Sequence, residues 1–143
     1  MTRTVLVLNG PNLGSLGTRE PEVYGSASYA DLVAACEDTA REAGLSADVR
    51  QTDDEATMLG WLHEAAGSGT PVVINPGAWS HYSYALRDAV VAVADVVEVH
   101  LTQTAAREEF RHTSVVSPVV RATITGLGFE GYRAALRAIA AAG

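Results

Sequence analysis

A chain of 143 residues can bury a sizeable core, and we expect it to form a single domain over 1–143. Its 17 acidic residues outnumber its 10 basic residues, and the net charge of −7 argues against nucleic acid or an anionic membrane as a partner. All ten basic residues are arginines, which excludes lysine Schiff-base chemistry, including a lysine-anchored pyridoxal phosphate.

Cysteine content and hydropathy predict a cytoplasmic location. Cys36 is the only cysteine, so an internal disulfide cannot form and a reducing compartment is expected. The first residues lead directly into an apolar run without a signal-peptide pattern, and no apolar run reaches the length of a membrane span.

The first apolar run, 5–8, predicts a buried strand, and a long segment rich in glycine, proline and asparagine follows it. A loop of this length inside a compact domain is usually functional or disordered. It carries Arg19 and Tyr24 between turn-forming residues. Taken alone, the segment fits equally well a mobile surface loop in which both side chains are solvated.

Strands and helices are predicted to alternate along the rest of the chain. The predicted strands are 5–8, 47–51, 71–74, 96–101 and 119–125. Helical periodicity predicts helices after Ser28, after a capping box at 52–55, after Ser80, over 104–111 and over 132–140. This alternation predicts a parallel sheet with right-handed crossovers and helices on both faces.

Polar side chains gather where three of the predicted strands end. They are Asn9, Asn12, Arg19 and Tyr24 after the first strand, Asn75 and His81 after the third, and His100, Thr102 and Arg111 at and after the fourth. Ligands of such sheets bind beyond the carboxyl ends of the strands. The sequence therefore predicts one site at this edge of the sheet.

Three other kinds of site fit the residues less well. His81 and His100, with Glu98 or Asp88, could ligate a metal, but their spacing matches no helical or short-loop metal pattern. The turn at 126–128 has two glycines but lacks the third glycine and the acidic ribose partner of a dinucleotide site. A Ser–His–Asp hydrolase is not supported, because no strand–nucleophile–helix elbow is present.

Acid–base chemistry fits the residues better. Tyr24 could act as a base if its pKa fell from about 10 towards neutrality, which takes about 4 kcal/mol, and the Arg19 guanidinium could supply much of this. Glu98 and His100 lie two residues apart in a predicted strand and so share a face, where the carboxylate would keep His100 protonated as a general acid. This set suggests proton abstraction next to a carbonyl, followed by loss of a leaving group.

The sequence resembles the type II 3-dehydroquinate dehydratases (type II dehydroquinases) over nearly its whole length. The stretches that carry the resemblance are Asn9-Gly-Pro-Asn-Leu-Gly-x-Leu-Gly-x-Arg19-Glu-Pro-x-x-Tyr24-Gly, Gln51-x-Asp-x-Glu55, Asn75-Pro-Gly-Ala-x-Ser-His81-Tyr-Ser-x-Ala-Leu-x-Asp88-Ala, Glu98-Val-His100-Leu-Thr102, Arg107-Glu-Glu-Phe-Arg111 and Gly126-Leu-Gly128. It implies a flavodoxin-like three-layer α/β sandwich with a five-stranded parallel sheet in the order 2-1-3-4-5. It also implies a cofactor-free and metal-free anti elimination of water from 3-dehydroquinate, giving 3-dehydroshikimate through an enolate, in the shikimate pathway.

The resemblance assigns catalytic roles to five residues. Tyr24 would be the base, Arg19 on a lid at about 15–25 would lower its pKa, and Asn12 would hold a water against the enolate oxygen. His100 would be the general acid, oriented by Glu98.

The resemblance also assigns substrate contacts. Asn75, Leu101 and Thr102 would bind the substrate carboxylate and a nearby hydroxyl, and His81 and Arg111 would hold the ring hydroxyls.

A homododecamer built as a tetramer of trimers is implied as well, in which Asp88 reaches a neighbouring subunit's site. Trp79 and Gln103 depart from the family pattern and motivate an alternative, a paralogous dehydratase for a modified quinate-like acid. A flavodoxin-like module binding flavin or another phosphate ligand is a further alternative, which the loop carrying Pro11, Arg19 and Pro21 disfavours.

Overall fold

The computed structural model describes residues 2–18 and 20–143, with the side chains of Val23 and Tyr24 outside that description. Its five strands are β1 (Arg3–Asn9), β2 (Leu45–Gln51), β3 (Val72–Asn75), β4 (Val96–His100) and β5 (Ala122–Thr125). All neighbouring pairs are parallel, and the strand order is β2-β1-β3-β4-β5, as the resemblance implies.

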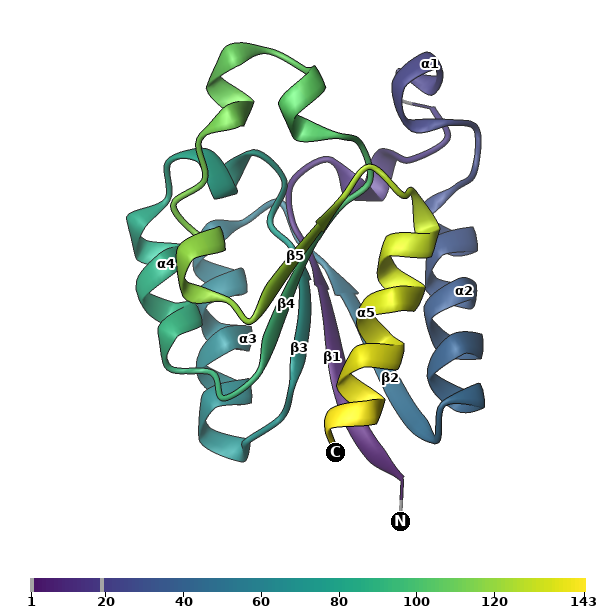
Figure 1. Ribbon diagram of the computed structural model, residues 1–143, viewed down its shortest axis with the longest axis vertical. Helices are drawn as coiled ribbons and strands as arrows, with labels where there is room; N and C mark the ends of the chain where they lie inside the picture. The colour runs from purple at the N-terminus through teal and green to yellow at the C-terminus, as the bar shows by residue number, and fades with distance from the viewer. Residues whose placement is uncertain (1, 19) are drawn as a thin grey trace.

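Helices cover both faces of the sheet (Figure 1). The described part of the chain forms the α-helices α1 (Pro21–Tyr24), α2 (Tyr29–Glu42), α3 (Glu55–Ser68), α4 (Tyr84–Val91) and α5 (Phe129–Ala142). In Figure 1, α2 and α5 lie on one side of the sheet and α3 and α4 on the other. Short 3-10 turns occur at Leu13–Ser15, Gly77–His81, Thr104–Ala106, Glu109–His112 and Ser117–Val119.

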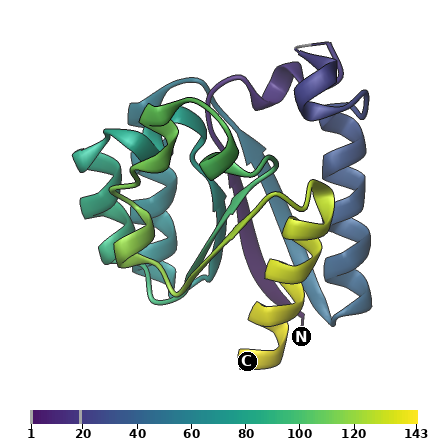
Figure 2. The same ribbon diagram turned by 45° about the horizontal axis from the view of Figure 1, so that its top comes forward.

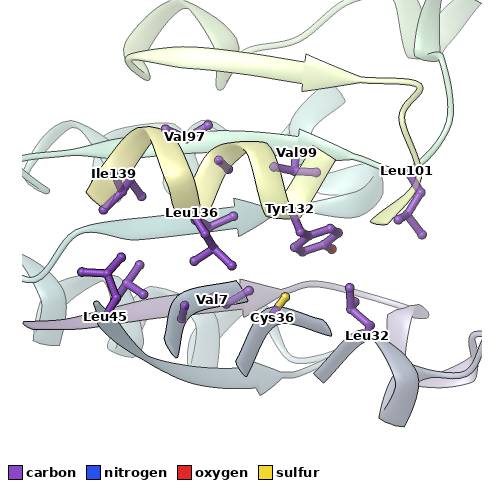
Figure 3. Packing of buried hydrophobic residues seen from close by; sticks show 14 of the residues in the cluster. Val7, Leu32, Cys36, Leu45, Val97, Val99, Leu101, Tyr132, Leu136 and Ile139 are labelled. Carbon is purple, nitrogen blue, oxygen red and sulfur yellow. The ribbon is translucent and has the colours of Figure 1, made fainter. Parts of the chain in front are cut away.

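Alternate residues of the central strands feed two separate cores. Val5 and Val7 of β1 point into the core under α2 and α5, whereas Leu6 and Leu8 point into the core under α3 and α4. These strands are buried on both faces, which explains their continuous apolar runs. Figure 3 shows part of the first core, where Tyr132 of α5 lies among aliphatic side chains from the sheet and from α2.

The register brings the carboxyl ends of the central strands level. Asn9 at the end of β1 pairs with Gln51 of β2 on one side and with Asn75 of β3 on the other. His100, the last residue of β4, pairs with Thr125 of β5. The polar residues that end the strands are therefore presented along one edge.

Several predicted helix starts are wrong by a few residues. The capping box at Ser28 and Asp31 is present as predicted. The cap of α3 is Asp54, because the Thr52 hydroxyl instead accepts a hydrogen bond from the Asp54 N–H. The cap of α4 is Ser83, whose hydroxyl accepts from the Leu86 N–H, whereas the segment around Ser80 forms a 3-10 turn.

The segment between β4 and α5 is also less regular than predicted. The helix predicted over 104–111 is two 3-10 turns, and the strand predicted over 119–125 begins only at Ala122. A 3-10 turn containing Pro118 precedes that strand. No helix among the described residues is long and apolar enough to cross a membrane.

We predict that Cys36 does not react with thiol reagents in the folded protein. The side chain is fully buried in α2, and burial raises the pKa of the thiol to about 12. Because the thiolate is the reactive form, almost none is present at pH 8. Titration with a chromogenic disulfide should show no reaction in buffer and one equivalent in denaturant; stoichiometric labelling of the native protein would contradict the prediction.

Candidate active site

A pocket lies beyond the carboxyl ends of β1, β3 and β4. The loops that follow these strands form its walls, and they rise above the sheet in Figure 1 and come forward in Figure 2. The lining residues are Pro11, Asn12, Leu13, Asn75, Gly77, Ala78, His81, His100, Leu101, Thr102, Thr104, Arg107 and Arg111. This is the edge at which the sequence predicts a site.

The predicted site residues fall into four groups by position. Seven of them line the pocket: Asn12, Asn75, His81, His100, Leu101, Thr102 and Arg111. Glu98 is completely buried behind the wall, and Asp88 is exposed on α4 and does not line the pocket. Arg19 and the side chain of Tyr24 lie outside the described residues.

Glu98 and His100 form a buried pair, on the shared strand face that their spacing predicts. The His100 Nε2 and the Glu98 Oε2 are 2.6 Å apart. Since the carboxylate can only accept, Nε2 carries the proton, and Nδ1 remains as the ring nitrogen for a ligand in the pocket. The histidine is thus fixed in both tautomer and orientation.

Two hydroxyl groups satisfy the other oxygen of the buried carboxylate. Glu98 Oε1 accepts hydrogen bonds from Ser117 Oγ at 2.7 Å and from Thr123 Oγ1 at 3.2 Å. A buried carboxylate is costly unless it is fully hydrogen-bonded, and these donors together with His100 meet that requirement. The carboxylate is therefore available as a fixed partner for His100.

His81 is held in the opposite tautomer, in which Nε2 is the hydrogen-bond acceptor. Its Nδ1 donates to the carbonyl oxygen of Thr113 at 2.8 Å, which leaves Nε2 without a proton. Burial lowers the pKa of His81, and the nearby charges of His100 and Arg111 lower it further, against the hydrogen bond to Thr113. The His81 ring stacks on that of His100 with centroids 6.5 Å apart.

The motif Gln51-x-Asp53-x-Glu55 holds the walls of the pocket in place. Asp53 Oδ1 accepts the backbone N–H of Asn12 at 2.8 Å, and Gln51 Nε2 donates to the Gly10 carbonyl at 3.1 Å. Glu55 accepts the hydroxyl proton of Ser83, the cap of α4. Asn12 has a φ of 71°, in the left-handed region that asparagine tolerates better than most residues.

Arg107, for which the sequence pattern predicts no role, lines the pocket together with Arg111. The Arg107 Nη1 is 3.4 Å from Thr102 Oγ1, and both arginine side chains are largely buried. The i, i+4 spacing of the two arginines was the available signal, but the segment forms no regular helix from which a shared face could be predicted. Both guanidinium groups also pair with Glu108, whose Oε1 lies 3.6 Å from Arg107 Nε and 3.0 Å from Arg111 Nε, so one carboxylate offsets part of the positive charge that they bring to the pocket.

Trp79 and Gln103, which depart from the family pattern, do not line this pocket. Trp79 is buried in the core under α3 and α4. Gln103 Oε1 accepts the hydroxyl proton of Thr125 at 2.6 Å and so joins the loop after β4 to the end of β5. Within residues 2–18 and 20–143, no cluster of three or more His, Cys, Asp or Glu side chains could hold a metal ion.

A doubly wound parallel sheet of this order, with a pocket lined by two arginines at its carboxyl edge, defines a flavodoxin-like α/β protein. The sequence model of the family "Dehydroquinase class II" matches residues 3–140. The chain belongs to this family.

Relatives and solved structures agree with that assignment. The chain is 62% identical over 138 residues to the 3-dehydroquinate dehydratase of Salinispora tropica, covering 96% of each chain. It is 53% identical over 137 residues to the 3-dehydroquinate dehydratase 2 of Pseudomonas aeruginosa, covering 95% of this chain and 93% of the relative. The crystal structure of the type II dehydroquinase from Propionibacterium acnes superposes with a TM-score of 0.96 at 56% identity, covering 99% of this chain and 98% of that one.

We predict that His81 makes the folded protein less stable as the pH falls through the range in which an ordinary histidine protonates. The lowered pKa keeps His81 neutral when the unfolded chain already binds a proton at about pH 6.5, so its contribution to stability is fully present above that pH. Urea unfolding of the wild type and of His81→Asn between pH 5 and 8 checks this. The variant should lose less stability on acidification, and identical pH slopes would contradict the prediction.

Proposed function

We propose that the protein is a 3-dehydroquinate dehydratase that removes water from 3-dehydroquinate by an anti elimination through an enolate, giving 3-dehydroshikimate in the shikimate pathway. The observation that carries the proposal is the buried His100–Glu98 pair, which presents one free ring nitrogen to a pocket lined by two arginines in a chain of the class II dehydroquinase family. The substrate is a small carboxylate with several hydroxyl groups, and the pocket offers donors and acceptors for both kinds of group.

Tyr24 and Arg19 are proposed to perform the first step. The phenolate of Tyr24 removes a proton from the carbon next to the substrate ketone, and the electron pair moves onto the carbonyl oxygen as an enolate. Arg19, on a lid at about 15–25, keeps the phenol ionised because a nearby cation favours the charged form. A water held by Asn12 hydrogen-bonds to the enolate oxygen and stabilises the negative charge there.

His100 is proposed to perform the second step. The enolate collapses, the bond to the departing hydroxyl breaks, and a proton from His100 Nδ1 converts that hydroxyl into water. The proposal is supported by the 2.6 Å contact between Nε2 and the Glu98 carboxylate, because a buried anion stabilises the imidazolium that must form. The Tyr24 phenol and the neutral His100 exchange protons with solvent before the next turnover.

The remaining pocket residues are proposed to orient the substrate. Asn75 with Leu101 and Thr102 binds the carboxylate and a nearby hydroxyl. Arg111 and the unprotonated His81 Nε2 bind ring hydroxyls, for which a neutral histidine is a suitable acceptor. The alternative of a modified quinate-like substrate loses its motivation, since neither Trp79 nor Gln103 lines the pocket.

We further propose that 1–143 acts as one catalytic domain in the cytoplasm and assembles into a homododecamer, a tetramer of trimers. The exposed apolar side chains of Tyr84 and Val91 on α4 support an interface there, because large apolar groups are favoured at subunit contacts. Asp88 lies on the same helix, outside its own subunit's pocket, and is proposed to reach a neighbour's pocket.

Turnover of 3-dehydroquinate, followed by the ultraviolet absorbance of the conjugated enone product, tests the reaction and its base. We expect Tyr24→Phe and Arg19→Ala each to lower kcat by about 10²-fold or more, the usual range for loss of acid–base catalysis. Arg137→Ala, which makes the same change as Arg19→Ala at an exposed position, is the control and should stay within about threefold of the wild type. A folded wild type without turnover would refute the substrate assignment, and an active Tyr24→Phe would refute the base.

Subunit complementation tests the placement of Asp88. Asp88→Ala and Tyr24→Phe homomers should both be nearly inactive, but oligomers reassembled from an equal mixture should regain about a quarter of the sites, because each such site takes one intact residue from each of two subunits. Each variant reassembled alone is the control. Mixed oligomers that form, as seen by native mass spectrometry, yet stay inactive would place both residues in the same subunit's site.

A further inference from the structure

A chain of buried hydrogen bonds runs directly beneath the pocket and connects three elements of the fold. Tyr132 of α5 is completely buried, and its hydroxyl lies between the side chains of Asn9 and Asn75 at the ends of β1 and β3. Figure 3 shows the Tyr132 ring among the packed side chains of this core. Of these three hydrogen-bonded residues, Asn75 is the one that also lines the pocket.

The two ends of this chain fix the direction of every hydrogen bond in it. At one end Asn75 Oδ1 accepts the backbone N–H of Gly77 at 3.1 Å, and at the other Asn9 Nδ2 donates to the carbonyl of Arg50 at 3.2 Å. A backbone N–H can only donate and a backbone carbonyl can only accept. Neither the Asn75 nor the Asn9 side-chain amide can therefore be flipped without breaking its hydrogen bond to the backbone.

The Tyr132 hydroxyl connects the two amides, because it can donate to one of them and accept from the other. It donates its single proton to Asn9 Oδ1 at 2.6 Å and accepts one Nδ2–H of Asn75 at 2.9 Å. Burial raises the pKa of the Tyr132 phenol, so it keeps the proton that this arrangement needs at neutral pH. The Oδ1 of Asn75 is engaged by Gly77 and one of its two Nδ2 hydrogens by Tyr132, which leaves the second N–H to offer to the pocket.

We propose that Tyr132 is a positioning residue for substrate binding: its hydroxyl locks the Asn75 amide so that an N–H donor, and not the carbonyl oxygen, faces the pocket. The group that Asn75 recognises is accordingly an acceptor, a carboxylate or hydroxyl oxygen of the substrate. This inference deepens the proposed function, and its kinetic test rests on that function.

Tyr132→Phe removes the acceptor for Asn75 while keeping the ring that fills the core. The Asn75 amide then loses one of its two anchors, and a ligand must order it at the moment of binding. We expect KM for 3-dehydroquinate to rise about tenfold, the equivalent of about 1.4 kcal/mol, with kcat within about threefold of the wild type. If Tyr132→Phe is less stable than the wild type but has the same KM, the Tyr132 hydroxyl has a purely structural role and the proposal is overturned.

Tyr29→Phe is the matched control. Burial raises the pKa of the Tyr29 phenol and the nearby Asn9 side chain lowers it, whereas the side-chain hydrogen bonds described for Asn75 go to Tyr132 and Gly77, so removal of the Tyr29 hydroxyl leaves the Tyr132–Asn75 link intact. We expect KM and kcat of this variant to stay within about twofold of the wild type even if its melting temperature falls. Equal increases in KM in both variants would assign the effect to the core as a whole and overturn the proposal.

Amide proton exchange provides a test that does not depend on turnover. In an NMR spectrum the Asn75 side-chain amide, assigned by its absence in Asn75→Ala, should show one slowly exchanging proton, the one donated to Tyr132. Its exchange should become about tenfold faster or more in Tyr132→Phe and stay unchanged in Tyr29→Phe. An unchanged exchange rate in Tyr132→Phe would overturn the proposal, whereas a wild type that exchanges as expected but does not turn over would count only against the proposed function.

Discussion

The level register of the parallel strands is the constraint on which the site depends. Because β1 pairs with β3 residue for residue up to Asn9 and Asn75, two amides from distant parts of the sequence end side by side. The same alignment places His100 at the end of β4, facing the loops that follow β1 and β3. A slip of one residue in β4 would turn Glu98 and His100 to the opposite face of the sheet, and the pocket would lose its buried acid–base pair.

The charges of the site are arranged in two layers with opposite sign. The anion Glu98 is below the surface of the pocket, where three side chains donate to it, and the guanidinium groups of Arg107 and Arg111 line the space above. A protein of net charge −7 thus places two arginine side chains at this pocket. The two histidines differ in tautomer, because Nε2 of His100 donates to the Glu98 carboxylate whereas Nδ1 of His81 donates to a backbone carbonyl.

Local patterns predicted those parts of the fold that depend on local physics. The apolar runs of the strands follow from burial on both faces, and the Glu98–His100 pair follows from the two-residue period of a strand. Helix starts were less predictable, since Ser80 and Ser83 are both good caps and only the tertiary structure selects between them. The link between Tyr132 and Asn9 joins residues 123 positions apart, and no local pattern reports where the last helix packs on the sheet. Arg107 was missed for a related reason, because irregular segments have no period from which a shared face can be predicted.

The burial of Cys36 has a practical consequence for studying the segment around α1. The chain has a single thiol, and it lies in the core beneath α2, so no native cysteine needs to be replaced before a reporter is attached. A cysteine introduced at the exposed Glu22, in the short helix α1, would be the sole accessible attachment point for a fluorophore. The movement of that segment could then be followed in an otherwise unaltered background.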